Sequence, residues 1–390
     1  MRAEGEATPM DETDTTAVLE AARRFVAREV APYVHEWDEA GAFPRALYAR
    51  AAAAGLLQLG YPEALGGVPA PWRLRCELSR TLARECASGG VLASLFSHNI
   101  ALPPIVAHGS EELRRRIVPP VLRGEAIAAL AITEPSGGSD VAALRTRAVR
   151  DGDHYVIDGE KTYITSGLRA DWLTVAVRTD PHGHGAAGIS LLAVPGDAPG
   201  LTRTELKKMG WWCSDTAQLR FEGVRVPAAN LIGVEGQGFK LVMQNFNAER
   251  LSMAALAVGF AEACLAEALD WARTRRTFGQ PLLAHQAIRH KLADMTMRIE
   301  SAAAWLAQLA ARADAVDSGP AWVAHVCLLK NHATQTMQFC ADAAVQILGG
   351  MGFMRGTVCE RIYREVKVMT IGGGAEEIMK ELAARQLGYT

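Results

Sequence analysis

The order of local sequence patterns along the chain constrains its fold more than any other feature. From Thr16 to about residue 123, apolar residues recur at three- and four-residue spacing, with breaks at Pro103-Pro104 and Pro119-Pro120. Short β-branched or apolar runs then fill residues 125–235, and from Gly236 the helical pattern returns. Because helices precede and follow the strands, the alternating order of a parallel dinucleotide-binding sheet is absent.

This order predicts an α+β protein of three domains behind a short tail. We expect a polar, disordered tail over residues 1–15, a helical domain over 16–124, a β domain over 125–235 and a helical bundle over 236–390. Long helices are predicted at about 238–273, 281–315, 320–348 and 375–387, and strands around 155–157, 173–177, 189–194 and 217–221. Asp151-Gly152 and Asp158-Gly159 are predicted turns.

Composition narrows the possible partners and the compartment. The formal net charge of −2 and the pI of about 6.6 favour neither nucleic acid nor an anionic membrane. The seven scattered cysteines indicate reduced core thiols, and no His or Cys cluster has the spacing of a metal site. The longest apolar stretch, Leu251–Leu265, contains Glu262 and is shorter than a bilayer span. With an acidic N-terminus unlike a signal peptide, these features predict a cytoplasmic protein.

One glycine motif is not interpreted as a nucleotide site. Gly183–Gly188 has the G-x-G-x-x-G spacing, but the strand-like Ile189–Val194 follows it. The Rossmann motif needs a helix at that point, so that the pyrophosphate meets a helix N-terminus. A hairpin loop is the expected structure.

A single carboxylate interrupts the apolar stripe of the long helix after Gly238. The stripe consists of Phe239, Val242, Phe246, Met253, Leu256 and Phe260, and Glu249 lies within it. A carboxylate among buried apolar side chains costs several kcal/mol, by order of magnitude, unless it is paired or neutralised. Helical spacing alone leaves two interpretations open: a general base with a tuned pKa, or a structural ion pair.

Several segments, in order, resemble the acyl-CoA dehydrogenase family. They are Ile132–Asp140, Gly159–Gly167, Lys208–Thr216, Phe221–Pro227, Arg275–Leu282 with His285-Gln286, and Gln346–Gly352 followed by Arg364–Lys367. The resemblance covers residues 15–390 and implies the family fold: an N-terminal helical domain, a middle β-barrel or sandwich, and a C-terminal four-helix bundle.

The resemblance also implies an FAD site shared between subunits. Residues matching flavin-binding positions in the same subunit are Thr133, Ser139, Tyr163, Thr165 and Glu377; Tyr163 stands where the family more often has Trp. Residues matching positions that reach a neighbouring subunit's FAD are Arg275, Phe278, Gln286, Gln346 and Gly350. A homotetramer, built as a dimer of dimers, is therefore expected.

The catalytic base of many family members is absent from its usual position. Counting from Arg364–Lys367, that position is Gly373, within Gly372-Gly373-Gly374. A second family pattern, seen in isovaleryl-CoA and long-chain dehydrogenases, has the base on the preceding long helix directly before an Arg. Glu249-Arg250 matches that pattern. Glu376 and Glu377 are rivals, but they also suit the first turn of the predicted 375–387 helix.

The expected reaction is α,β-dehydrogenation of an acyl-CoA. Glu249 would take the α proton, flavin N5 the β hydride, and the N–H of Gly373 with a flavin hydroxyl would hold the thioester carbonyl. Ser139, Asn247 and Arg250 are predicted near the substrate, and Leu92, Ala93 and Phe96 at the acyl-pocket floor. An electron-transfer flavoprotein is the expected acceptor. The alternatives are a flavin oxidase or monooxygenase of the same fold, or a DNA-binding relative.

Overall fold

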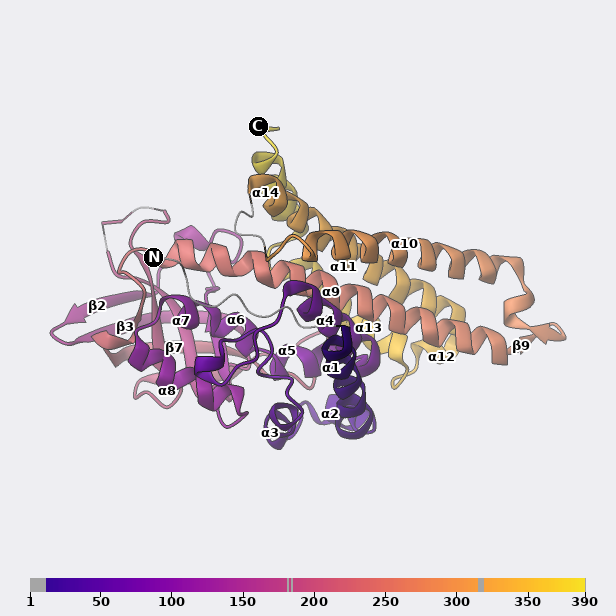
Figure 1. Ribbon diagram of the computed structural model, residues 1–390, viewed down its shortest axis with the longest axis horizontal. Helices are drawn as coiled ribbons and strands as arrows, with labels where there is room; N and C mark the ends of the chain where they lie inside the picture. Colours follow the sequence, from indigo (N-terminus) through magenta and orange to yellow (C-terminus); the bar gives the residue numbers. More distant parts are fainter. Residues whose placement is uncertain (1–11, 181, 184, 315–318, 390) are drawn as a thin grey trace.

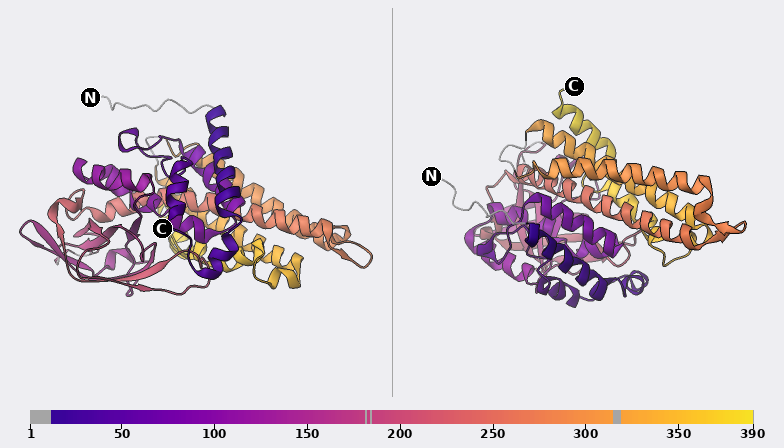
Figure 2. Two further views of the ribbon diagram at one scale, coloured as in Figure 1. Left: turned by 90° about the horizontal axis from the view of Figure 1, so that it is seen from below. Right: turned by 45° about the vertical axis from the view of Figure 1, so that its right-hand side comes forward.

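The computed structural model describes residues 12–180, 182–183, 185–314 and 319–389; residues 1–11 of the expected tail lie outside this range. The elements follow the predicted order of helices, sheet and long helices. Figure 1 shows the sheet at one side, the long C-terminal helices extending to the other, and the N-terminal helices below their junction. Figure 2 shows the same arrangement from two further directions.

Among the N-terminal helices, α4 lies along the long helix α9 (Gly238–Thr274), and α1 and α5 contact α4. Gly259 of α9 permits this close approach, because a Cβ there would overlap the carbonyl oxygen of Arg80 on α4. The helices are α1 (Glu12–Phe25), α2 (Val34–Ala40), α3 (Ala46–Ala53), α4 (Trp72–Cys86), α5 (Gly89–Leu95), α6 (His98–Ala101), α7 (Pro103–His108) and α8 (Glu111–Leu122).

The middle domain is one mixed sheet in the order β6-β7-β3-β2-β4-β5-β8, with β1 paired to β4. Its central strands β4 and β5 are buried along almost their whole length, whereas β7 alternates buried and exposed residues towards its end. The strands are β1 (Ala128–Ala131), β2 (Arg147–Asp151), β3 (His154–Thr165), β4 (Trp172–Arg178), β5 (Ile189–Pro195), β6 (Leu201–Glu205), β7 (Thr216–Pro227) and β8 (Leu231–Ile232).

The two predicted Asp-Gly turns have different outcomes. Asp151 pairs with His154 across the β2–β3 hairpin, so the first turn is confirmed. The second is wrong: Asp158-Gly159 lies inside β3, where the pairing with β7 shifts between Ile157 and Gly159. Gly159 has φ +145°, and a Cβ there would lie 2.7 Å from Cα of Thr146. The glycine marks an irregularity in a continuous strand rather than a chain reversal.

The C-terminal helices form a bundle in which α9, α10, α11 and α13 contact one another. A short hairpin of β9 (Arg276–Thr277) and β10 (Gln280–Pro281) follows α9 at the outer end of the bundle (Figure 1). The remaining helices are α10 (Gln286–Ala310), α11 (Pro320–Leu348), α12 (Gly350–Phe353), α13 (Val358–Ile371) and α14 (Glu376–Gln386).

Helix α9 is longer and more apolar than the stretch 251–265 suggested. By length and composition it could cross a membrane, but 61% of its most apolar window is buried inside the protein. It packs against α4, α10, α11 and α13, which is typical of a helix in a protein core. All seven cysteines are also buried and unpaired, as expected for core thiols.

Three other helical predictions need correction. Residues 12–15 of the expected tail already belong to α1, where Asp14 suits the positive end of the helix dipole. Pro119-Pro120 do not break α8. Both lie in its last turn, so the helix loses only the two hydrogen bonds that their own missing N–H groups would have made. Helix α13 was not predicted, although Thr357 caps the N–H of Glu360 at 3.3 Å and residues 359, 362, 366 and 369 form a buried stripe.

Candidate active site

Glu249 lies one third of the way along α9, with its side chain directed into the protein. The residue is partly buried, and its Oε2 atom is fully buried with no hydrogen-bond partner among the described residues. Burial raises the pKa of Glu249 to about 7, against the opposing effects of Arg250 and Lys330. Such an unpartnered carboxylate is rare in a protein interior and favours the interpretation as a base over that as a structural ion pair.

The turn between α13 and α14 brings Gly373 next to this carboxylate. A Cβ on Gly373 would lie 3.8 Å from Oε1 of Glu249 and 2.6 Å from Sδ of Met253. Gly373 also has φ +65°, which a residue with a side chain adopts only with strain. A glutamate at position 373 therefore does not fit this turn, and the carboxylate in this space comes from α9.

The backbone N–H of Gly373 is available to a ligand. The N–H of Gly372 still donates to Val368 O at 2.7 Å and closes α13, whereas no described residue accepts from the N–H of Gly373. The turn thus presents a free donor beside the Glu249 carboxylate. A free N–H and a carboxylate are the pair of groups needed to hold a carbonyl and remove a neighbouring proton.

Arg250, the next residue on α9, contacts the same glycine turn. Its Nε donates to Gly373 O at 3.0 Å and its Nη1 to Asn247 Oδ1 at 3.1 Å, and the residue is only 5% exposed. Arg250 and Asn247 are thus hydrogen-bonded to each other beside the candidate base. The guanidinium hydrogen bonds hold the protein backbone, and the predicted substrate contacts stay predictions.

The rival carboxylates begin α14, as expected from their sequence position. Oε2 of Glu376 accepts from Nε2 of Gln335 at 3.0 Å, and Glu377 is exposed. Both residues lie in the first turn of the helix, where acidic side chains are stabilised by the helix dipole. Neither has the unpartnered buried oxygen that distinguishes Glu249.

An exposed aromatic ring stands on strand β3. Tyr163 is 71% exposed and has φ +60°, a conformation that costs about 1 kcal/mol or more for a residue with a side chain. It lies where the β3–β7 pairing shifts between Lys161 and Ile164. Bulges of this kind redirect a side chain and are common beside active sites.

The segment after β1 adjoins this bulge. The N–H of Thr162 donates to Thr133 O at 2.8 Å, which brings Thr133 beside Tyr163. Thr165 is partly buried two residues further along β3, and Ser139 is exposed in the loop after Thr133. Thr133 and Thr165 are therefore neighbours of Tyr163, and Ser139 lies in the adjoining loop; their contacts to a flavin stay predictions.

A buried ion pair anchors the segment that follows β1. Nζ of Lys161 lies 2.8 Å from Oε1 of Glu134, and the two residues are 0% and 5% exposed. Glu134 also accepts the N–H groups of Arg145 and Thr146 at 2.6 and 2.8 Å. Sequence analysis did not identify this pair, because Glu134 was considered only as part of the 132–140 motif.

Comparison with known proteins decides the family. The chain matches the models of the acyl-CoA dehydrogenase N-terminal domain over residues 12–125, the middle domain over 129–224 and the C-terminal domain over 236–388. The chain belongs to the acyl-CoA dehydrogenase family. It is therefore an oxidoreductase of a flavin-dependent family that dehydrogenates acyl-CoA thioesters, with the fold expected from the sequence motifs.

Similar proteins extend over nearly the whole chain. A probable acyl-CoA dehydrogenase of Bacillus subtilis, YngJ, is 36% identical, with coverage of 95% of this chain and 97% of that one. Cyclohexane-1-carbonyl-CoA dehydrogenase of Geobacter metallireducens is 35% identical, with coverage of 95% and 96%. The crystal structure of a probable acyl-CoA dehydrogenase from Mycobacterium abscessus has 46% identity and a TM-score of 0.93, with coverage of 97% and 100%.

The predicted contacts to a neighbouring subunit's flavin lie at the end of the helical bundle opposite the sheet that carries Tyr163. Arg275 and Phe278 follow the end of α9, roughly 39 Å along the helix from Glu249 at 1.5 Å per residue. Figure 1 shows the β9 hairpin and α12 at the end of the bundle opposite the sheet. The far set is exposed at this end and consists of Arg275, Phe278, Gln286, Gln346 and Gly350. One chain alone therefore does not bring together all the residues that match acyl-CoA dehydrogenase cofactor positions.

The predicted acyl-pocket residues Leu92 and Ala93 lie on α5, and Phe96 follows directly after that helix. Oε2 of Glu365, on α13, accepts the N–H of Gly89 at 2.7 Å and Oε1 that of Gly90 at 3.3 Å, at the start of α5. Burial raises the pKa of Glu365 to about 7, and Asp38 adds to that effect. The acyl-CoA dehydrogenase motif Arg364–Lys367 is thus partly a structural connection between α13 and α5.

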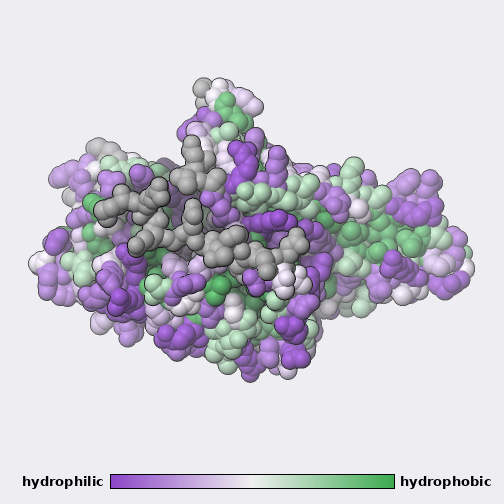
Figure 3. All heavy atoms as spheres, viewed as in Figure 1, coloured by the Kyte–Doolittle hydropathy of each residue, from purple (hydrophilic) through white to green (hydrophobic). Residues whose placement is uncertain are grey.

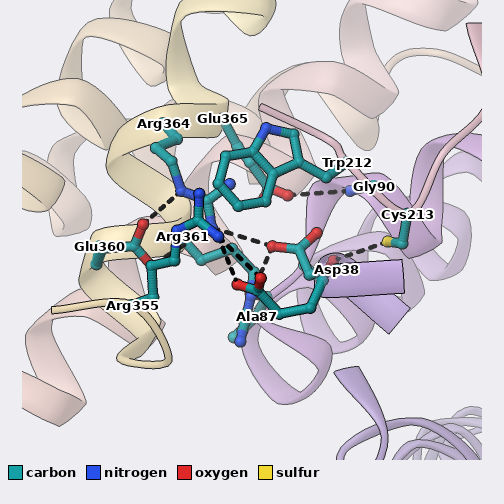
Figure 4. Close-up of polar contacts among 12 residues, drawn as sticks. Asp38, Ala87, Gly90, Trp212, Cys213, Arg355, Glu360, Arg361, Arg364 and Glu365 are labelled. Atoms are coloured by element: carbon teal, nitrogen blue, oxygen red, sulfur yellow. Dashed lines mark hydrogen bonds and ion pairs between the residues drawn. The ribbon is translucent and has the colours of Figure 1, made fainter. Parts of the chain in front are cut away.

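Charged residues surround this connection (Figure 4). Arg364 lies 3.0 Å from Asp38 and has its guanidinium 3.6 Å from the ring centre of Trp212. Nη1 of Arg361 donates to Ala87 O at 3.2 Å. Sequence analysis missed this cluster, because its members are far apart in the chain and charged helix residues normally face solvent.

A cavity of about 600 Å³ lies elsewhere, between the start of β2 and the end of β4. Arg178 lines it, but its guanidinium donates to backbone carbonyls, including those of Leu144, Ala142 and Gly185 at 3.2, 2.9 and 3.1 Å. The described lining contains neither Glu249 nor Tyr163. This cavity is therefore separate from the space beside Gly373.

Proposed function

We propose that this acyl-CoA dehydrogenase uses FAD and has Glu249 as its catalytic base, which converts an acyl-CoA to the trans-2-enoyl-CoA. The observation that carries the assignment is the buried, unpartnered Oε2 of Glu249 beside the bare α-carbon of Gly373. Its pKa of about 7 suits a group that must accept a proton near neutral pH.

The groups around Glu249 have complementary roles in this proposal. The free N–H of Gly373 donates to the thioester oxygen and stabilises the negative charge that develops there as the α proton leaves. Arg250 holds the carbonyl of Gly373 and so restrains the peptide unit that follows the donor. We assign Asn247, Arg250 and Ser139 to the substrate side, and Leu92, Ala93 and Phe96 to the end of the acyl pocket.

The residues around Tyr163 fit a flavin. Thr133, Ser139 and Thr165 supply hydroxyl donors, Tyr163 supplies an exposed aromatic face, and Glu377 completes the set from the same chain. A bound flavin would accept the β hydrogen as hydride.

Completion of this site requires a second copy of the chain. The far set of residues, led by Arg275 and Phe278, lies at the outer end of the bundle, and Phe278 is 96% exposed. Figure 3 shows hydrophobic side chains among hydrophilic ones along the bundle; Phe353 near this end and Met297 in the middle of α10 are also exposed. Large exposed apolar patches mark contact surfaces, which supports a homotetramer built from dimers with shared flavin sites.

For reoxidation of the reduced cofactor we propose an electron-transfer flavoprotein, and for the location of the enzyme the cytoplasm. The decisive experiment is anaerobic mixing of the purified yellow protein with butyryl-, isovaleryl-, octanoyl- and palmitoyl-CoA while flavin bleaching is followed. Wild type should bleach with at least one thioester, and Glu249→Gln should bleach roughly 10²- to 10⁴-fold more slowly.

Glu376→Gln is the matched control, since it removes the rival carboxylate nearest in sequence to Gly373. A Glu249→Gln enzyme with near-normal bleaching, or a Glu376→Gln enzyme without any, would reject the assigned base. Hydrogen peroxide released in step with turnover in air would favour the oxidase instead.

A further inference from the structure

The glycine turn beside Glu249 has little intrinsic rigidity. Gly373 and Gly374 have φ +65° and +111°, and both lie between the last turn of α13 and the start of α14. Glycine has the widest range of backbone angles, so an unrestrained turn of three glycines would adopt many conformations. A free N–H that must point at a carbonyl oxygen requires the turn to be held.

Two buried cations from different helices hold it. Nε of Arg250, on α9, donates to Gly373 O at 3.0 Å. Nζ of Lys330, on α11, donates to Gly374 O at 2.8 Å and to Thr370 O at 3.3 Å. Because a peptide unit is planar, a fixed carbonyl also fixes the N–H of the next residue. Arg250 therefore restrains the peptide unit between Gly373 and Gly374, and Lys330 restrains the next unit and the unit after Thr370. The unit that carries the Gly373 N–H lies between these restrained units.

Lys330 is unusual for its burial. The residue is 0% exposed, and among the described residues no carboxylate lies within ion-pair distance of its ammonium group. A buried ammonium without a paired carboxylate costs several kcal/mol, by order of magnitude. Its hydrogen bonds go to backbone carbonyls of Thr370 and Gly374, which lie on either side of Gly373 in the chain.

We propose that Lys330 is a positioning residue for the dehydrogenation, which holds the turn 370–374 so that the N–H of Gly373 faces the space beside Glu249. This inference rests on the proposed function, since it requires Glu249 to be the base. Below its own pKa, which burial lowers to about 8, Lys330 also contributes a positive charge near the Glu249 carboxylate. The charged groups that face Glu249 are Arg250 on its own helix and Lys330 on α11, and both lower the pKa that burial raises.

The test compares holoenzymes that carry Lys330→Met, Lys330→Arg and Thr334→Val. Lys330→Met removes the charge and the donor, and Lys330→Arg keeps both in a different shape. Thr334→Val is the control for disturbance of α11: Thr334 is buried one turn further along, and its hydroxyl donates only to Lys330 O and Asn331 O. The readout is the rate of anaerobic flavin reduction between pH 5.5 and 9, with the thioester that reduces wild type fastest.

The expected result is a fall in the maximal rate and a change in the pH dependence. Loss of a nearby cation moves the midpoint of the profile up by about one pH unit, so that the rate below the midpoint falls about tenfold. Lys330→Arg should recover part of both effects, and Thr334→Val should move neither. Where Lys330→Met does not fold, Lys330→Gln, which keeps a donor without the charge, takes its place.

The alternative is a purely structural lysine. In that case the melting temperature falls, but the folded Lys330→Met or Lys330→Gln enzyme reduces its flavin at the wild-type rate with an unmoved midpoint, and the inference is overturned. Glu249→Gln in the same assay separates the two proposals. If it bleaches normally, the proposed base is wrong; if it is inactive while the Lys330 variants are normal, only the role of Lys330 is wrong.

Discussion

The carboxylate of Glu249 faces the bare α-carbon of Gly373, and a Cβ on that glycine would lie 3.8 Å from Oε1. The two residues come from elements far apart in the chain, helix α9 and the turn after α13. Helix α9 supplies the carboxylate, and the turn after α13 supplies a free backbone N–H. This relationship gives the first two predictions.

The reductive half-reaction should depend on the ionisation of Glu249. Burial raises the pKa of this group from 4.5 to about 7, so below pH 7 the carboxyl group is protonated and cannot accept the α proton. The rate of flavin reduction should fall about tenfold per pH unit below the midpoint and level off above it. Stopped-flow reduction at a series of pH values measures this, and a rate that is flat from pH 5.5 to 8 would contradict it.

The same pKa predicts an effect on stability. A carboxyl group whose pKa is higher in the folded state binds its proton more tightly there, so its contribution to stability is greatest at low pH and is lost as pH rises towards 7. Glu249→Gln should therefore melt at a temperature equal to or above that of wild type at pH 8. A clear loss of thermal stability in this variant at pH 8 would indicate a structural ion pair.

Transfer of the carboxylate to the turn should not restore activity. In Gly373→Glu the new side chain would start 2.6 Å from Sδ of Met253 and from a left-handed backbone, which costs roughly 1–3 kcal/mol. The double variant Glu249→Gln/Gly373→Glu should stay as inactive as Glu249→Gln alone and should melt at a lower temperature. Flavin bleaching and a melting curve measure both, and recovery of the wild-type rate would show that the turn can accept a side chain.

Replacement of Tyr163 by glycine should raise the stability of the flavin-free protein but lower its retention of flavin. Tyr163→Gly removes the ring and the left-handed strain, which is about 1 kcal/mol, whereas Tyr163→Ala removes the ring alone. Both should retain less flavin after gel filtration, measured by the absorbance ratio of flavin to protein. Only the glycine variant should melt above wild type in the flavin-free form. Equal melting of the two variants would argue against strain at this position.

The buried ion pair between Lys161 and Glu134 should contribute to the stability of the folded protein. Lys161→Met leaves the Glu134 carboxylate buried without its cation, which costs about 3–5 kcal/mol. The double variant Lys161→Met/Glu134→Gln should recover part of that loss, because no uncompensated charge remains. Chemical denaturation compares wild type, Lys161→Met, Glu134→Gln and the double variant; additive effects of the two substitutions would show that the groups do not interact.

Shared flavin sites can be tested by complementation. Tyr163→Ala and Arg275→Ala should each lower flavin content, because they alter opposite ends of the proposed site. In a mixed dimer of the two variants, one site carries both substitutions and the other carries neither. Co-expression with two different tags, followed by tandem purification, should restore about half of the wild-type flavin content. No recovery would mean that each chain binds its cofactor alone.

Local patterns predicted most of the fold, since periodicity reflects which face of an element is buried. The alternation at Ala217–Phe221 and the long apolar stripe of α9 are examples. Gly159 shows the limit. Its Asp-Gly signal correctly indicates an unusual backbone angle, but whether that angle produces a reversal or an irregular strand depends on the strand β7 beside it.

In the candidate site, too, the residues with a local sequence signal could be predicted and those that depend on distant partners could not. Glu249 could be predicted because a charge within an apolar stripe is visible in the sequence. Lys330 shows the same signal between Leu329 and Ala333, and it was overlooked because no motif included it. Glu365 could not be predicted, because its partners Gly89 and Gly90 lie in another domain and their N–H groups have no sequence signature.

Helix α9 carries the Glu249 carboxylate near one end and runs without interruption to Arg275. Each residue inserted between them would rotate one end by about 100° and displace it by about 1.5 Å relative to the other. A single-residue insertion or deletion anywhere over 251–274 would thus misalign the proposed proton acceptor relative to the proposed cofactor contact. Changes of chain length during evolution should accordingly be tolerated in the surface connections and eliminated from this helix.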